Sequence, residues 1–128
     1  MATTNIWLAV AGGGALGASA RFAVGRWAFK AFGPGFPWAT LIVNVAGSLA
    51  MGILIAWLAG RAQVSEALRA FLSVGILGAF TTFSTFSLDV VSLAERKQYL
   101  AAAGYLSSSV VVSILALMAG LWLGRTLI

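Results

Sequence analysis

Neutral hydrogen-bonding side chains recur every four residues in two apolar stretches of this sequence. They are Thr40, Asn44 and Ser48 in one stretch and Tyr105, Ser109 and Ser113 in the other. Side chains four apart lie on the same face of an α-helix, so each set predicts a polar stripe along one helix. Hydroxyl and amide groups suit a small, strongly hydrogen-bonding anion better than a cation, which prefers carbonyl or carboxylate oxygens. The two stripes therefore favour a path for such an anion.

Three further kinds of residue could contribute to this path, and each also has a structural interpretation. Asn44 could donate to a passing anion, or it could hydrogen-bond to a neighbouring helix, as asparagines in membrane spans commonly do. Arg21 could attract anions into a vestibule, or its charged end could simply reach the water at the membrane boundary. Phe83 and Phe86 could pack in a core, or they could turn their positive ring edges toward an anion.

The sequence predicts that these residues are positioned by four transmembrane helices. Of all residues, 61% are hydrophobic and 9% are charged, and charge-free runs lie at 1–20, 31–60, 70–88 and 98–124. A helix of about 20 apolar residues crosses a bilayer. We expect spans at about 5–29, 38–60, 68–94 and 98–126, in a single all-α domain that covers residues 1–128. The first run has no basic segment before it, so we interpret it as a span rather than a secretory signal.

Glycines predict where the helices approach one another. Gly13 and Gly17 lie four apart in the first span, and Gly120 and Gly124 lie four apart in the fourth. Small residues at this spacing allow close packing of helices in lipid. Four helices are nevertheless few for enclosing a polar path, so we expect at least a dimer.

The third span has a composition that predicts an interruption of its helix. Gly75 and Gly78 are poor helix formers, and a run of hydroxyl side chains that compete with helical hydrogen bonds follows them. These are Thr81, Thr82, Ser84 and Thr85. Irregular backbone at membrane depth is tolerated only where protein buries it or where it lines a water-filled cavity. Interrupted helices in transporters tend to mark ion or substrate sites.

The composition argues against an enzyme. The sequence contains no cysteine, no histidine and only three acidic residues, so disulfides, thiolate or imidazole metal ligands and histidine-based acid–base chemistry are excluded. The net charge of +5 is dispersed, which disfavours a nucleic-acid-binding surface.

The basic residues are almost evenly divided between the two expected membrane faces. Arg61, Arg69 and Arg125 fall on the face that holds both chain ends, and Arg26, Lys30, Arg96 and Lys97 fall on the other. A weak bias of Lys and Arg determines orientation only weakly. The chain could therefore insert in both orientations, although the order of helix insertion could also fix a single one.

Two segments carry a resemblance to a known family. Thr40-Leu-Ile-Val-Asn44-Val-Ala-Gly47 and Gly75-Ile-Leu-Gly78-Ala-Phe-Thr-Thr-Phe-Ser-Thr-Phe-Ser87 resemble the signature segments of the Fluc (CrcB-type) fluoride channels. The likeness covers the whole chain, from the Gly-Ala-x-x-Arg end of the first span to the serine-bearing fourth span. The Thr-Thr-Phe-Ser-Thr-Phe segment is the most specific part of it.

The resemblance implies an antiparallel, dual-topology homodimer with two pores in the plasma (inner) membrane of a prokaryote, where fluoride leaves the cell passively. The pore residues that it implies are Arg21, Thr40, Asn44, Phe83, Phe86, Tyr105, Ser109 and Ser113. It also implies a structural sodium ion at the centre of the dimer, bound by backbone carbonyls of Gly78 and Thr81 from both chains. The expected partners are thus fluoride, sodium, a second copy of the chain and the lipid bilayer, with no nucleic acid.

The sequence departs from the family pattern near the sodium site, where Ala79 replaces the second glycine of a usual pair.

A small proton-coupled multidrug exporter is the main alternative, because such exporters share this size and dual topology. It would need a carboxylate embedded in the membrane, and Asp89 lies toward the end of a span. A scaffold subunit is a third interpretation, but it would not explain two aligned polar stripes.

Overall fold

The structure is a computed structural model that describes residues 2–127, and every regular element in that range is helical. The elements are α1 (Ala2–Phe32), α2 (Trp38–Ala59), α3 (Glu66–Ala70), the π-helix η1 (Phe71–Leu77), α4 (Gly78–Phe80), α5 (Ser84–Glu95) and α6 (Tyr99–Leu127). Within residues 2–127, four segments are long and apolar enough to cross a membrane. They are Thr3–Phe32, Trp38–Ala59, Glu66–Glu95 and Tyr99–Leu127. The protein is therefore an all-helical, multi-pass membrane protein.

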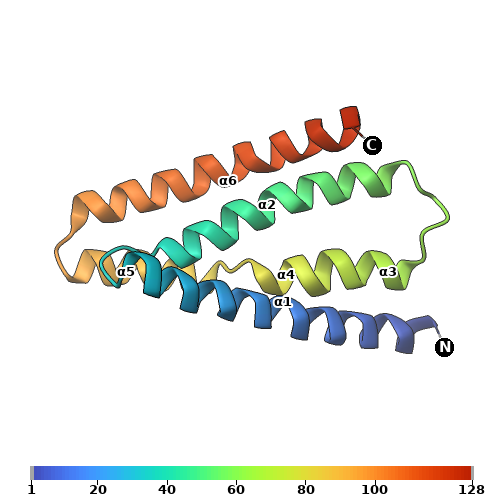
Figure 1. The fold of residues 1–128 in the computed structure, drawn as a ribbon, viewed down its shortest axis with the longest axis horizontal. Helices are drawn as coiled ribbons and strands as arrows, with labels where there is room; N and C mark the ends of the chain where they lie inside the picture. Colours follow the sequence, from blue (N-terminus) through green and yellow to red (C-terminus); the bar gives the residue numbers. More distant parts are fainter. Residues whose placement is uncertain (1, 128) are drawn as a thin grey trace.

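The four spans form two pairs of parallel helices (Figure 1). α2 packs along α6, while α1 packs along η1 and α4 of the third span. Both chain ends lie at the same end of the molecule as the α2–α3 loop, and the α1–α2 and α5–α6 turns lie at the opposite end. This arrangement places the third span, α2 and α6 close enough to line a common site.

Glycines bring the paired helices into backbone contact. A Cβ on Gly52 of α2 would overlap the carbonyl oxygen of Leu117 on α6, and a Cβ on Gly17 of α1 would overlap the carbonyl oxygen of Ile76 on η1. Gly13 and Gly120 make equally close approaches to the same partner helices. The predicted packing positions at Gly13, Gly17 and Gly120 are confirmed. Close backbone packing of this kind supports helix association in lipid.

The third span changes geometry several times along its length. Ser65 Oγ accepts a hydrogen bond from the Leu68 N–H at 3.1 Å and caps the start of α3, as serine commonly does at a helix N-terminus. The wider π-helical turns of η1 follow, then α4, which ends at Phe80. Thr81 is extended, with φ −88° and ψ 161°, and helical structure resumes at Ser84. Gly75 and Gly78 are themselves helical, and Gly75 serves instead for close approach to Gly13.

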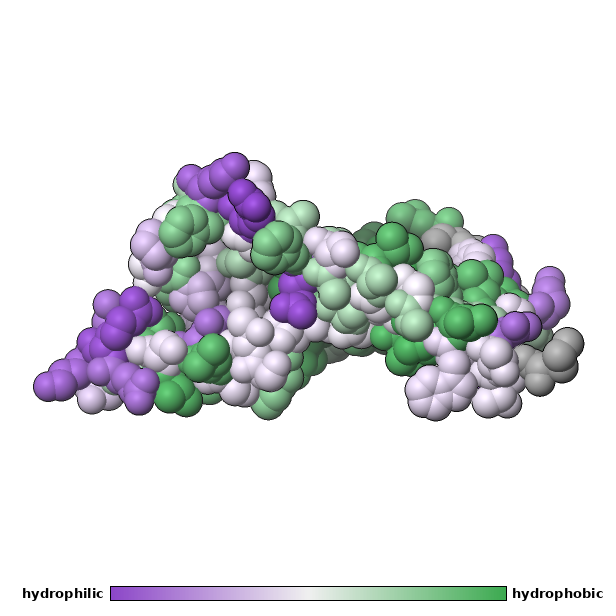
Figure 2. Space-filling model, turned by 90° about the horizontal axis from the view of Figure 1, so that it is seen from below, coloured by the Kyte–Doolittle hydropathy of each residue, from purple (hydrophilic) through white to green (hydrophobic). Residues whose placement is uncertain are grey.

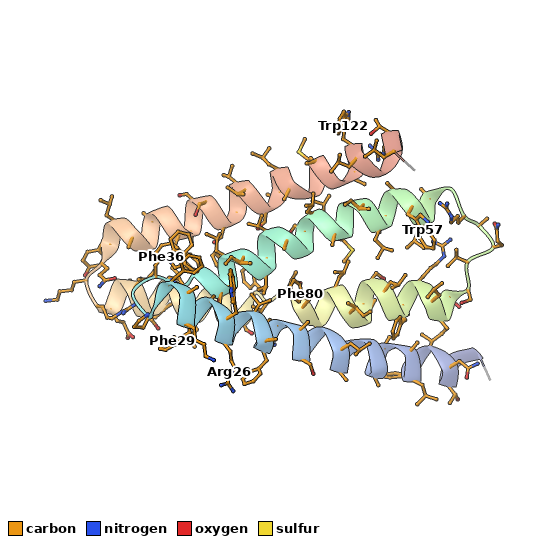
Figure 3. The ribbon with its side chains drawn as sticks, viewed as in Figure 1. Arg26, Phe29, Phe36, Trp57, Phe80 and Trp122 are labelled. Atoms are coloured by element: carbon orange, nitrogen blue, oxygen red, sulfur yellow. The ribbon has the colours of Figure 1, made fainter. Side chains whose placement is uncertain are left out.

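The surface is apolar along the middle of the molecule. Figure 2 shows that most strongly hydrophilic side chains lie toward the two ends, while the stretch between them is white to green, from weakly polar to hydrophobic. Trp57 and Trp122 lie toward one end, and Phe29 and Phe36 lie toward the other (Figure 3). Tryptophan side chains near the end of a membrane-spanning bundle are typical of the membrane–water interface.

Candidate functional site

The backbone at the helix interruption is held by Asn44 of α2. The Asn44 Oδ1 accepts a hydrogen bond from the Thr82 N–H at 2.8 Å, and the Asn44 Nδ2 donates to the Thr82 carbonyl oxygen at 3.0 Å. Since an amide nitrogen carries two hydrogens, one N–H of Asn44 remains for another acceptor. Asn44 therefore joins two helices, as its structural interpretation predicts, and still has a donor for a ligand.

Some backbone carbonyl oxygens near the end of α4 accept hydrogen bonds, and others do not. Leu77 O accepts from the Thr81 N–H at 3.1 Å and from Thr81 Oγ1 at 3.0 Å. Ala79 O accepts from Arg21 Nε at 3.1 Å. The hydrogen bonds among residues 2–127 include none to the carbonyl oxygens of Gly78, Phe80 and Thr81. Three hydrogen-bond acceptors are thus left free where the helix is interrupted.

A cavity of about 420 Å³ lies beside the interruption, and we call it the inner cavity. It is bounded by α2, by α4 and α5, and by α6. Its lining includes five of the predicted pore residues, together with both residues predicted to hold sodium. These are Asn44, Phe83, Phe86, Ser109 and Ser113, with Gly78 and Thr81. The structure therefore brings together residues that are far apart in the sequence.

Two serine hydroxyls face this cavity without a hydrogen-bond partner. Ser109 Oγ and Ser113 Oγ are buried, and neither is hydrogen-bonded to any group among residues 2–127. Most buried polar side-chain atoms have a partner, because burial without one costs free energy. Neither hydroxyl hydrogen is committed to an acceptor among the described residues.

Phe83 and Phe86 form a tilted pair, with ring centroids 5.6 Å apart and an angle of 53° between the ring planes. Phe83 is 78% exposed, whereas Phe86 is 7% exposed. Phe86 also packs against Tyr105, with ring centroids 5.4 Å apart. The two phenylalanines thus have different environments: Phe86 belongs to the core of this chain, while Phe83 projects from it.

Tyr105 lies outside the lining of the inner cavity. Its ring is fully buried beside Phe86 and Phe36, and its hydroxyl donates to Asp89 Oδ2 at 2.9 Å. This partner was not predicted, because Asp89 and Tyr105 belong to different helices. Their positions on either side of the short α5–α6 turn are the only signal that could have suggested it.

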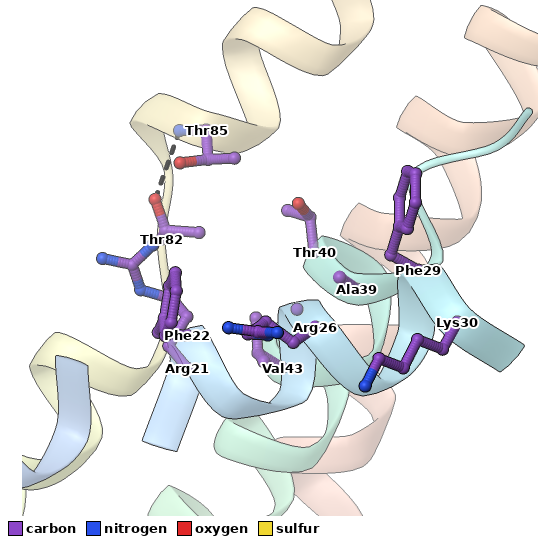
Figure 4. A pocket seen from close by; sticks show the side chains of 11 residues that line it. Arg21, Phe22, Arg26, Phe29, Lys30, Ala39, Thr40, Val43, Thr82 and Thr85 are labelled. Atoms are coloured by element: carbon purple, nitrogen blue, oxygen red, sulfur yellow. Dashed lines mark hydrogen bonds between the residues drawn. The ribbon is translucent and has the colours of Figure 1, made fainter. Parts of the chain in front are cut away.

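The remaining predicted pore residues, Arg21 and Thr40, line a second cavity of about 420 Å³, which we call the basic cavity. Figure 4 shows its lining side chains, among which Thr82 and Thr85 come from the interrupted span. Thr82 lines both cavities. Apart from Tyr105, the predicted pore residues therefore line two adjoining cavities rather than one continuous stripe.

The basic cavity contains two cations that the sequence prediction did not assign to the site. Arg26 and Lys30 line it together with Arg21. The sequence places both only on one of the two expected membrane faces. The sequence feature that could have identified them is their spacing on α1, because Arg21, Arg26 and Lys30 follow one another at intervals of five and four residues, roughly one helical turn each.

The fold and these cavities define a small, four-span membrane protein whose neutral polar groups gather around an interrupted helix, an arrangement typical of ion-transport proteins. The family model described as "CrcB-like protein, Camphor Resistance (CrcB)" matches residues 8–121. The chain belongs to this family, which confirms the resemblance found in its sequence.

Three relatives carry the name "Fluoride-specific ion channel FluC". The one from Agrobacterium fabrum is 52% identical over 92% of this chain and 94% of its own length. The one from Nitrobacter winogradskyi is 52% identical over 94% of this chain and 95% of its own length. The one from Chelativorans sp. is 53% identical over 91% of this chain and 93% of its own length.

Proposed function

We propose that this protein is a fluoride-selective, passive ion channel that exports fluoride from the cytoplasm and thereby gives fluoride resistance. The observation that carries this proposal is its identity of 52–53% to relatives named fluoride-specific ion channels, over more than nine-tenths of the chain. Such a protein is a channel rather than an enzyme, because ion passage makes and breaks no covalent bond.

The inner cavity supplies groups that suit fluoride. The unpartnered hydroxyls of Ser109 and Ser113 and the remaining N–H of Asn44 are neutral donors, so they can replace part of the hydration shell of a small anion without holding it as a full charge would. The positive ring edges of Phe83 and Phe86 add a weaker attraction. No acidic side chain lines the inner cavity, so no full negative charge there repels an anion.

We propose that two copies form an antiparallel, dual-topology homodimer with two pores. Large apolar side chains remain exposed on the single chain, including Trp7, Phe83 and Leu88, and lipid or a partner must cover them. An antiparallel partner would place its own surface against the projecting ring of Phe83. Cross-linking of the protein in vesicles should give a dimer and no larger species.

We further propose that a structural sodium ion binds between the two copies at the interruption. The free carbonyl oxygens of Gly78 and Thr81 fit this ion, because hard cations prefer oxygen ligands. Two copies would contribute four such oxygens. Ala79 is compatible with the site, since its carbonyl is bonded to Arg21 and its neighbours keep theirs free.

The proposed location is the plasma (inner) membrane of a prokaryote. The cellular test is growth of a prokaryotic strain that lacks fluoride export and produces either this protein or its Ser109→Ala, Ser113→Ala variant. The wild-type chain should restore growth at fluoride concentrations that stop the parent strain, and the double variant should restore it poorly. Equal fluoride sensitivity with and without a membrane-inserted wild-type chain would refute the proposal.

The alternative, a proton-coupled multidrug exporter, finds little support in the site. Between Glu66 and Glu95 at the two ends of the interrupted span, Asp89 is the one further acidic residue. Its carboxylate accepts a hydrogen bond from Tyr105, and Asp89 does not line the inner cavity. An exporter would need a proton gradient and would release organic cations. A channel would release fluoride without a proton gradient.

A further inference from the structure

The basic cavity contains more positive charge than the proposed pore requires. Arg21, Arg26 and Lys30 all line it, and no acidic side chain does. Arg21 is tied to the third span through the bond from its Nε to Ala79 O. Arg26 and Lys30 form no hydrogen bond or salt bridge to other described residues that would neutralise them. Their charge is therefore available to an ion that enters the cavity.

The three cations follow one another along α1 toward the interruption. At a rise of about 1.5 Å per residue, Lys30 and Arg21 lie about 14 Å apart along the helix axis, with Arg26 between them. In Figure 4 the side chain of Arg26 lies between those of Arg21 and Lys30. Each gap is within the Debye length of about 8 Å at physiological ionic strength. Their potentials therefore overlap along the cavity.

Hydroxyl donors also line the basic cavity. Thr40, Thr82 and Thr85 line it, and Thr82 also lines the inner cavity. An anion that moved from Lys30 past Arg26 would thus reach neutral donors next to the helix interruption. Arg21 lies at this same end with its Nε bonded to Ala79 O, so an anion there meets one arginine together with neutral donors.

We propose that Arg26 and Lys30, together with Arg21, form a capture site for small monovalent anions that feeds the inner cavity. The proposal rests on the proposed channel function and adds the residues that set its rate of anion entry. Clefts lined by charges of one sign raise the local concentration of an oppositely charged ligand and its rate of entry by about 10-fold or more, and salt weakens this effect.

The test compares wild-type protein with the Arg26→Gln, Lys30→Gln double variant in vesicles of phosphatidylcholine. At low ionic strength and low fluoride concentration, the double variant should conduct fluoride about three- to tenfold more slowly. The difference should disappear at saturating fluoride or in about 1 M of an impermeant salt, where the Debye length is about 3 Å. The double variant Arg26→Lys, Lys30→Arg keeps both positive charges. It should therefore conduct fluoride at most of the wild-type rate. Arg125→Gln, which removes a charge that lines neither the basic cavity nor the inner cavity, should leave the rate unchanged.

A second measurement tests capture without relying on fluoride flux. Trp27 adjoins Arg26 and is 55% exposed, so iodide concentrated by the cations should quench its fluorescence. The double variant should weaken quenching by iodide but not by neutral acrylamide, and Trp27→Phe should abolish the difference between the two proteins.

The outcomes separate the two proposals. If wild-type protein conducts no fluoride but iodide quenching still depends on Arg26 and Lys30, the channel proposal fails and anion capture stands. If fluoride flux is normal and neither salt-dependent flux nor iodide quenching responds to the double variant, the capture proposal is wrong. It is also wrong if the variant changes flux only in vesicles that contain phosphatidylglycerol, because the cations would then bind lipid phosphate.

Discussion

The side-chain amide of Asn44 binds both the N–H and the carbonyl oxygen of Thr82, at 2.8 Å and 3.0 Å. These two bonds replace the helical hydrogen bonds that the Thr82 backbone would make if the third span were continuous. Without them, polar backbone groups would be left unpaired at membrane depth, where lipid offers no hydrogen-bond partner. Asn44 is thus both a support for the interruption and a potential ligand in the inner cavity.

The first prediction concerns this pair of bonds. Asn44→Ala should lower the free energy of unfolding by about 1–3 kcal/mol, because two backbone groups of Thr82 lose their partner. It should also slow fluoride flux. Thermal unfolding in detergent and flux from vesicles measure the two effects. Ser48→Ala, at a neighbouring position on the same side of α2, is the matched control and should change stability much less. Unchanged stability in Asn44→Ala would contradict the supporting role.

The second prediction separates Phe83 from Phe86. Each substitution by isoleucine should reduce fluoride flux at least tenfold, because an aliphatic side chain has no positive ring edge. Only Phe86→Ile should also destabilise the chain noticeably, since Phe86 is buried against Tyr105 and a change of shape in a core is costly. Normal flux in a folded Phe83→Ile variant would refute the role of the ring edges.

The third prediction distinguishes functional from structural hydroxyls. Ser109→Ala and Ser113→Ala remove buried groups that have no partner, so neither should reduce stability, and each could raise it slightly. Both should lower fluoride flux. Ser108→Ala is the control: its Oγ donates to the Tyr105 carbonyl oxygen at 3.3 Å, and its loss should leave flux near wild type. Flux that is equally insensitive to all three changes would show that the hydroxyls play no part in conduction.

The fourth prediction concerns sodium. If the free carbonyls of Gly78 and Thr81 bind it in a dimer, then replacing sodium with N-methylglucamine should lower the thermal stability of the dimer. A ligand that binds only the folded state stabilises it by about 2.7 kcal/mol at one hundred times its dissociation constant. The effect should saturate with sodium concentration, which separates binding from a general salt effect. A stability that is the same in both cations at equal ionic strength would rule the site out.

How far the sequence could predict the site is clear from Asn44, Tyr105 and Arg21. The charge-free runs define the four helical segments because length and apolarity alone determine what can cross a bilayer. The hydroxyl and amide side chains of the inner cavity were also identifiable, since their helical spacing reports a shared face. Their partners were not, because spacing within one helix does not reveal which backbone group of another helix lies opposite.

Tyr105 illustrates this limit. Its spacing with Ser109 and Ser113 predicted a place in the same polar stripe, whereas its hydroxyl donates to Asp89 and its ring is buried outside the cavity lining. Arg21 likewise is bonded to Ala79 O through its Nε, and only its terminal nitrogens remain for an anion. Both pairings depend on how the third span packs against α1 and α6, which the spacing within one helix does not reveal.

The central claim is that this protein conducts fluoride selectively and passively. Efflux of anions from vesicles that hold about one dimer each, with an ionophore that relieves the membrane voltage, tests it most directly. We expect fluoride to leave rapidly without a proton gradient while chloride is retained, and the Ser109→Ala, Ser113→Ala variant to slow the release. Equal release of both anions would contradict the selectivity, and retention of fluoride by a well-folded dimer would contradict the channel itself.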